Sequence, residues 1–175
     1  MGGYALFDTA IGRCGVAWGD NGITAVQLPE RTEAATVARL GRYGSAAEPP
    51  AAVTAAITRM TALLRGDHDD LTDIAVDPEG IPEFDGRVYA IARAIPPGET
   101  LTYGEVATRL GLPGSAQAVG QALGRNPYPI VVPCHRVLGA NGRVGGFSAG
   151  DGAVTKLRIL GIEGAAPGGQ PSLFD

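Results

Sequence analysis

The first part of the chain is a series of short, β-rich apolar runs separated by glycine-containing turns. The runs YALFDT, RCGVAWGD and ITAVQL are joined by AIG and by DNG at 20–22. Asn and Gly tolerate the positive φ that a tight hairpin turn needs. The pattern therefore predicts strands and hairpins within residues 4–30.

The spacing of apolar positions changes after residue 30. It predicts helices at about 32–43 and 51–65, the second ending at Gly66 in a C-cap position. The acidic run that follows, 67–80, contains DIAV, which we expect to form a short strand.

Shorter helices are expected in the second half. Phe84, Val88, Ile91 and Ile95 share one face of a helix over 84–95. Thr102 and Glu105 have capping-box spacing at the start of a helix over 102–112, and a further short helix covers 115–125 after a Gly-Pro break. The last pair fits a helix-turn-helix, and it fits two ordinary packed helices equally well.

The end of the chain is punctuated by proline and glycine. Residues 126–133 are too proline-rich for a helix or a central strand, and GANGRVGGF resembles a hairpin or wing. A last helix is expected over 152–164. Its inward residues are predicted to be Val154, Leu157, Leu160 and Ile162.

The length and the charge distribution of the chain limit its domain number and the partners that it can have. A chain of 175 residues forms one domain or two small lobes. The net charge of −4 is uneven, at −7 over residues 1–85 and +4 over 86–148. A basic middle is typical of nucleic-acid binding, although scattered solvated charges explain it equally well. There is neither a membrane-length apolar run nor a secretory signal, so we expect a cytoplasmic protein without a membrane partner.

The only cysteines are Cys14 and Cys134, too few for a disulfide framework and typical of a reducing compartment. Cys14, in an apolar strand, is interpreted as a buried hydrophobe. The only histidines are His68 and His135, and neither lies in a Cys/His cluster. We therefore expect neither a metal site nor a cofactor, and we interpret His68 as a solvated loop residue.

Cys134 and His135 are adjacent in PCHRV. A thiol is nucleophilic only as thiolate, and with a pKa of about 8.5 little of it is ionised at neutral pH. In an extended segment adjacent side chains point to opposite faces, so cooperation would need a bridging water. Glu163 is a candidate to orient the imidazole. The residues by themselves leave a thiol enzyme and a buried cysteine as open alternatives.

A longer set of motifs surrounds this pair. PCHRV follows NPYPIVV and precedes GANGRVGGFS, while IPPGETLTYGEVA lies upstream and KLRILGIEG downstream. Together they resemble the O6-alkylguanine-DNA alkyltransferases, also called methylated-DNA–protein-cysteine methyltransferases. The resemblance implies an α/β N-terminal lobe (1–80) of ribonuclease-H-like topology with a small sheet plus helices. A mainly helical, winged-helix-like C-terminal lobe (81–165) and a flexible tail (166–175) would follow.

The resemblance also implies the activity. Family members transfer an alkyl group irreversibly from O6-alkylguanine in double-stranded DNA to a cysteine, once per molecule. They bind the minor groove and flip the damaged nucleotide into a pocket. We therefore expect DNA as the partner and a monomeric protein; whether copies cluster along DNA stays open.

Roles carry over to matching positions. Cys134 would be the acceptor, His135 the base acting through water, Glu163 its orienting partner and Tyr103 the proton donor to guanine N3. Asn126 would brace the turn around the cysteine. The remaining residues expected at the substrate or DNA are Gln117, Ala118, Gly120, Arg125, Arg136, Val137, Phe147 and Ser148. The backbone carbonyls of Cys134 and Val137 would accept hydrogen bonds from the exocyclic amine of the guanine, and the backbone amide of Ser148 would face its O6.

The chain departs from the family pattern at three places. AQAVG at 116–120 has Gln117 where the family commonly has an arginine that replaces the flipped base. Phe147 stands where tyrosine is frequent, and residues 149–152 include a two-residue insertion. The main alternative is an alkyltransferase-like protein that binds lesions without transfer; a Cys-His hydrolase and a winged-helix regulator are more distant ones.

Overall fold

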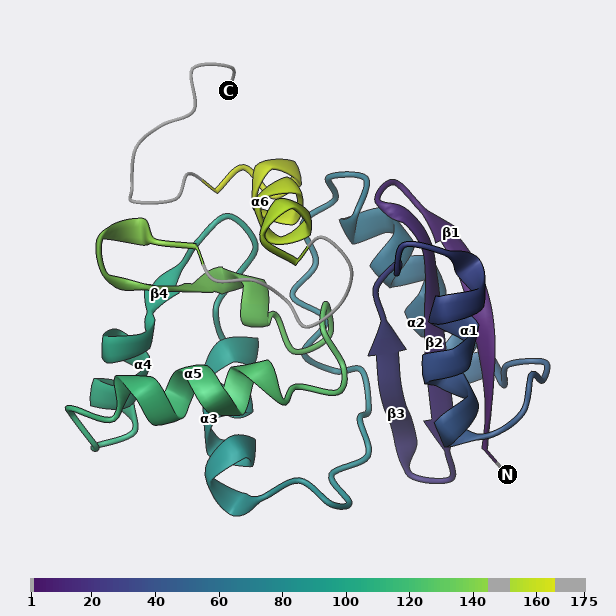
Figure 1. Ribbon diagram of the computed structural model, residues 1–175, viewed down its shortest axis with the longest axis horizontal. Helices are drawn as coiled ribbons and strands as arrows, with labels where there is room; N and C mark the ends of the chain where they lie inside the picture. Colours follow the sequence, from purple (N-terminus) through teal and green to yellow (C-terminus); the bar gives the residue numbers. More distant parts are fainter. Residues whose placement is uncertain (1, 145–151, 166–175) are drawn as a thin grey trace.

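The computed structural model describes residues 2–144 and 152–165, and its elements form two groups along the chain (Figure 1). The N-terminal elements are β1 (Gly3–Thr9), β2 (Gly12–Gly19), β3 (Gly22–Gln27), α1 (Glu33–Leu40), the 3-10 helix η1 (Gly41–Tyr43) and α2 (Ala51–Leu63). The C-terminal elements are α3 (Glu83–Arg93), β4 (Leu101–Thr102), α4 (Tyr103–Arg109), α5 (Ala116–Gly124), η2 (Cys134–Arg136), β5 (Val137–Leu138), η3 (Ala140–Gly142) and α6 (Gly152–Ile162).

The predicted hairpins are present. The strands β1, β2 and β3 form one antiparallel sheet in sequence order, with Thr9 paired to Gly12 and Gly19 paired to Gly22. The positive φ angles lie at Gly12 (118°) and Gly22 (126°) and not at Asn21. The residue that needs the freedom of glycine is therefore the one that ends each turn.

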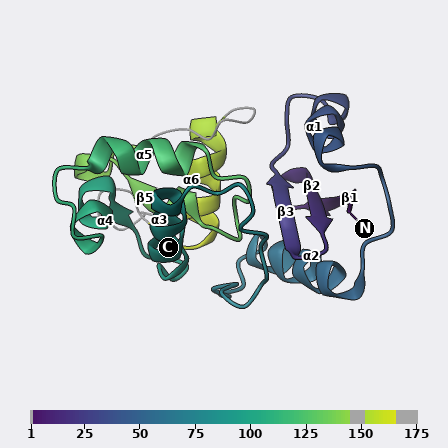
Figure 2. The same ribbon diagram turned by 90° about the horizontal axis from the view of Figure 1, so that it is seen from below.

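Helices α1 and α2 cover opposite faces of this sheet (Figure 2). On the α1 face a Cβ atom at Gly15 would lie 2.2 Å from Leu40 Cδ1, so close packing of α1 requires glycine there. On the α2 face Cys14 is buried in the main core, as expected. Burial raises the pKa of the Cys14 thiol to about 11, so this thiol stays protonated at neutral pH.

The prediction of a strand over the segment DIAV is wrong. Only Val76 forms a bridge, to Ile23, flanked by hydrogen bonds from Ile23 N to Ala75 O (3.0 Å) and from Asp77 N to Ile23 O (2.8 Å). Nearby, Arg93 Nη2 donates to the carbonyls of Leu71 and Ile74 at 2.8 and 2.9 Å. A side chain of α3 therefore holds this acidic segment in place of a longer strand ladder.

The helices predicted in the second half are confirmed with ends shifted by a few residues. Helix α4 begins with the Thr102–Glu105 capping box. Its link to α5 contains Gly111 and Gly114, which both have positive φ. A two-residue parallel pairing of β4 with β5 lies beside these helices.

The inward face predicted for α6 is partly wrong. Val154 and Leu157 are 67% and 46% exposed, whereas Leu160 is buried as expected. Lys156 and Ile159 are buried in their place. The Lys156 ammonium donates to Val137 O at 2.8 Å, and this polar anchor turns the helix to a face that apolar periodicity did not indicate.

The two groups of elements share one continuous core. They are also linked by hydrogen bonds from Val26 N to Pro127 O (2.9 Å) and from Tyr128 Oη to Asp77 O (2.9 Å). Strand β3 therefore runs beside the segment that leads to Cys134. Within the described ranges we find no helix that is both long and apolar enough to cross a bilayer. The expected tail, 166–175, lies outside the described residues.

Candidate active site

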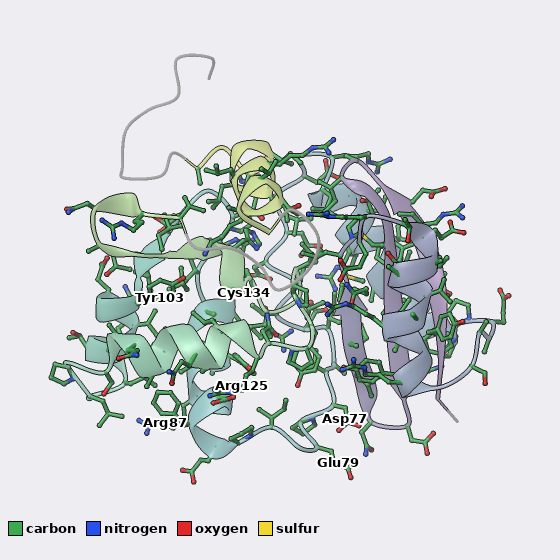
Figure 3. All side chains as sticks on the ribbon, in the orientation of Figure 1. Asp77, Glu79, Arg87, Tyr103, Arg125 and Cys134 are labelled. Atoms are coloured by element: carbon green, nitrogen blue, oxygen red, sulfur yellow. The ribbon has the colours of Figure 1, made fainter. Side chains whose placement is uncertain are left out.

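Cys134 lies at the start of a tight turn and not in an extended segment. Residues Cys134–Arg136 form the 3-10 helix η2, with Arg136 N donating to Pro133 O at 2.9 Å. The strand-like alternation expected for Cys134 and His135 therefore does not apply. Cys134 is 8% exposed and lines a cavity of about 240 Å³ together with Tyr103 and Gly120. Figure 3 shows Cys134 and Tyr103 on the same side of α5.

Asn126 holds the loop that carries the cysteine. Its Nδ2 donates to Val132 O at 2.9 Å, and its Oδ1 accepts from Tyr128 N at 3.1 Å. Val132 O also accepts from Cys134 N at 2.8 Å. The brace expected from the sequence therefore acts through one shared acceptor, because Asn126 Nδ2 and the Cys134 backbone N–H both donate to Val132 O.

His135 and Glu163 meet as expected. His135 Nε2 lies 2.9 Å from Glu163 Oε2, and both residues are buried. Arg136 was expected at the DNA surface, and this is wrong, because it is only 1% exposed. Its Nε and Nη2 donate to Glu163 at 3.0 and 2.8 Å, and its Nη1 donates to Ile95 O at 2.7 Å. Arg136 is thus the buried counterion of Glu163.

The charges of this cluster follow from burial and pairing. Burial lowers the pKa of His135, although Glu163 beside it opposes the shift. Burial alone would raise the pKa of Glu163, but hydrogen bonds from His135 and Arg136 outweigh it and lower that pKa to about 2. Because Arg136 neutralises the carboxylate, the imidazole stays neutral and can accept a proton at neutral pH.

The cysteine itself needs such a base. Burial raises the pKa of the Cys134 thiol, while hydrogen bonding to Asn126 and the charge of Lys156 oppose the shift. The resting side chain is therefore a protonated thiol. Deprotonation has to accompany the reaction, which fits a neutral imidazole on the next residue.

These shifts predict a fall in stability at acid pH. In the unfolded chain His135 takes up a proton below a pH of about 6.5, which the buried imidazole resists. Glu163 adds to the loss as the pH falls from about 4.5 towards its folded pKa of about 2. Each resisted proton costs about 1.4 kcal/mol per pH unit. Urea midpoints measured from pH 8 to pH 3 should decline from near pH 6.5; a flat profile down to pH 5 would contradict this.

Lys156 is a site residue that the sequence analysis missed. It is 3% exposed, and its Nζ lies 5.8 Å from the ring centroid of Tyr103, in cation–π range. Burial lowers the pKa of Lys156 and raises the pKa of Tyr103. The available signal was that Lys156 is the only lysine in the chain.

The remaining predicted residues lie mainly on and after α5. Gln117 is exposed, and Gly120 faces the Tyr103 ring, with a Cβ there 3.9 Å from Cε1. Ala118 lies on the same helix, and its side chain is half-buried. Arg125 follows α5, and its Nε and Nη2 bind the buried carboxylate of Asp85 on α3, both at 2.9 Å. Asp85 was not anticipated.

The backbone groups expected to read the base each have one partner. Val137 is buried, and its carbonyl accepts from Lys156; the Cys134 carbonyl accepts from Val137 N. A carbonyl oxygen has a second lone pair, so each can accept one more hydrogen bond. Phe147 and Ser148 lie outside the described residues. Within residues 2–144 and 152–165, no three His, Cys, Asp or Glu side chains lie close enough together to hold a metal ion.

We compared the sequence and the structure with those of known proteins. Residues 83–165 match the family model of the 6-O-methylguanine DNA methyltransferase DNA binding domain. A methylated-DNA–protein-cysteine methyltransferase of Mycolicibacterium paratuberculosis is 37% identical over 98% of both chains. The crystal structure of Mycobacterium tuberculosis O6-methylguanine methyltransferase has a TM-score of 0.77 and 34% identity, with full coverage of both chains. The same organism's OGT in complex with DNA has a TM-score of 0.71 and 31% identity over 92% of each chain. A relative this similar over nearly its whole length shows that the chain belongs to the methylated-DNA–protein-cysteine methyltransferase family.

Proposed function

We propose that this protein repairs DNA by moving the alkyl group of O6-alkylguanine irreversibly onto Cys134. One observation carries the proposal: the sulfur lies in the wall of a cavity, and His135 in the same turn is paired with Glu163, which follows α6. Membership of the family supports the reaction class. A cysteine packed only by aliphatic side chains could not receive a nucleobase.

The step is a displacement at a saturated carbon. His135 takes the thiol proton through a water, and the thiolate attacks the alkyl carbon in line with the C–O bond. The S–C bond forms as the C–O bond breaks, and the electron pair stays on the guanine. The product is a thioether without an easy reverse path, so each molecule reacts once.

The departing guanine anion needs a proton and nearby positive charge. Tyr103 lines the cavity and can donate its hydroxyl proton to N3 of the purine. The buried ammonium of Lys156 lies beside the Tyr103 ring and favours negative charge in the cavity. The carbonyls of Cys134 and Val137 would accept from the exocyclic amine.

We infer further that α5 is the recognition helix and enters the DNA minor groove. Small residues there, including Ala118 and Gly120, allow close approach, and exposed Gln117 takes the place of the flipped nucleotide. This rests on a ribonuclease-H-like lobe (1–80) and a winged-helix-like lobe (81–165). The protein would act as a monomer. It would act in the cytoplasm, because the acceptor thiol must stay reduced.

Mass spectrometry tests the proposal. Incubation with a duplex oligonucleotide containing one O6-methylguanine should add one methyl group per molecule, located on Cys134. The oligonucleotide should be returned with guanine at that position. Retained lesion binding without an adduct would instead identify a lesion-binding protein, and turnover beyond one equivalent would contradict the single-use mechanism.

Replacing Gln117 with arginine is expected to strengthen binding to lesion DNA. The planar guanidinium of arginine can stack on the neighbouring bases, and it carries a positive charge that glutamine lacks. Stacking is worth about 1 kcal/mol or more per base, so about a fivefold gain in affinity is expected. Binding isotherms on duplex DNA measure this, with Gln121→Arg, an exposed position one turn further along α5, as the control. Equal affinities of Gln117→Arg and the natural protein would contradict this role.

A further inference from the structure

The cavity of Cys134 extends beyond the cysteine and passes between α5 and the N-terminal elements. Its lining includes Val26 and Gln27 of β3, Arg39 at the end of α1, and Arg42 of η1. We call this extension the inter-lobe groove. It is continuous with the space next to the sulfur.

The charge of the groove differs from that of its surroundings. Its lining contains Arg39, Arg42, Arg125 and Lys156, and no Asp or Glu side chain among the described residues. Residues 1–85 carry a net charge of −7. The N-terminal elements are therefore acidic overall, yet they direct two of their six arginines into the wall of this groove.

Both walls present guanidinium groups to solvent. Arg42 is exposed, and the Arg39 side chain stays 47% exposed although its Nε lies 2.6 Å from Glu30 Oε1. On the opposite wall, Arg125 is 56% exposed and is held by the two hydrogen bonds that it donates to the buried Asp85. A carboxylate that fixes one edge of a guanidinium reduces the entropy lost when its other edge binds an anion.

The two walls also share one face of the molecule. Helices α1 and α5 lie along the same edge in Figure 2 and both lie towards the viewer in Figure 1. A duplex lying on α5 therefore passes the end of α1. A positively charged groove at that place suits the evenly spaced phosphates of a DNA strand.

We propose that Arg39 and Arg42 bind backbone phosphates of the DNA strand next to the extruded nucleotide. The N-terminal elements then form a second DNA contact beyond the recognition helix. This inference rests on the proposed function for the identity of the lesion. The phosphate contacts themselves do not depend on alkyl transfer.

The test compares Arg42→Gln and the double variant Arg39→Gln/Arg42→Gln with the natural protein. The control is Arg65→Gln, an exposed arginine just after α2, the helix that covers the other face of the sheet from α1. Affinity for a lesion-containing duplex is measured across a salt series. Each lost phosphate contact should lower the slope of log affinity against log salt by about 0.9. Affinity at 0.1 M salt should then fall about eightfold per arginine.

A second measurement uses free O6-benzylguanine, whose activated benzyl carbon can react with the thiol but which carries no phosphate. Its reaction with Cys134 should proceed at the natural rate in every variant, while transfer from DNA at sub-saturating concentrations slows in step with affinity. A slower reaction with the free base would show that the arginines act on the cysteine or the fold, and would overturn the proposal.

The salt series decides the rest. An unchanged slope in the double variant, or an equal loss in Arg65→Gln, would also overturn the proposal. If the natural protein accepted no alkyl group but the slope still fell as expected, the groove would stand and the proposed function would fail.

Discussion

Replacement of Cys134 with serine is expected to abolish alkyl acceptance while leaving lesion binding intact. The hydroxyl has the same shape but is far less acidic than the thiol, so His135 cannot generate a comparable nucleophile. Loss of a nucleophile typically costs on the order of 10^4-fold or more in rate. Single-turnover transfer from a methylated duplex, followed by mass spectrometry, measures the effect. Binding to the same duplex reports on the fold.

Cys14→Ala provides the matched control. Cys14 is 1% exposed, contacts Thr9 Oγ1 at 3.6 Å in the sheet and does not line the cavity. This variant should lose some packing energy and still take up one methyl group. Methyl uptake by Cys134→Ser, or loss of uptake in a folded Cys14→Ala, would contradict the assignment of the acceptor.

Replacement of Glu163 with glutamine should have the largest effect on stability. The carboxylate is 2% exposed, and it binds His135 and neutralises buried Arg136. The neutral amide would leave the Arg136 charge buried without its counterion. Breaking a buried pair in this way costs about 3–5 kcal/mol. The urea midpoint should fall by about 2 M, given a typical m-value of about 2 kcal/mol/M.

Two further variants separate charge from other causes. Glu83→Gln removes an exposed carboxylate from the first turn of α3 and should change stability by less than about 0.5 kcal/mol. Glu163→Asp keeps the charge and should recover part of the loss. Under conditions where Glu163→Gln is folded, transfer should be slower, because the imidazole has lost the carboxylate whose charge stabilises its protonated form. A midpoint within error of the natural protein would refute the buried pair as a stabilising unit.

The helices and strands were largely predictable because their signals are local. Glycines at turns, the capping box at Thr102 and the spacing of Val88 and Ile95 each act within one or two turns of the chain. These patterns recovered the three-stranded sheet and the order of helices α1 to α6. They failed for α6, where the buried face is chosen by the contact of Lys156 with Val137, 19 residues away.

The same distinction between local signals and distant contacts applies to the candidate site. Adjacent Cys134 and His135 are visible in the sequence, and resemblance to the family indicated Glu163 and Asn126. The sequence could not place Arg136, because a charged residue beside the candidate cysteine suits a DNA surface as well as a buried ion pair. Only the fold brings it to Glu163, 27 residues away.

By itself, the sequence therefore determined most helices and the N-terminal strands and pointed to Cys134 and His135 as the candidate pair, because these signals depend on neighbouring residues. Tertiary structure alone decided which charges are buried. It turned Arg136 and Lys156 inward, gave Arg125 its carboxylate partner Asp85, and set Arg39 and Arg42 facing the cavity of Cys134. The physical reason is that the cost of burying a charge depends on partners from distant segments, and their approach is a property of the whole fold.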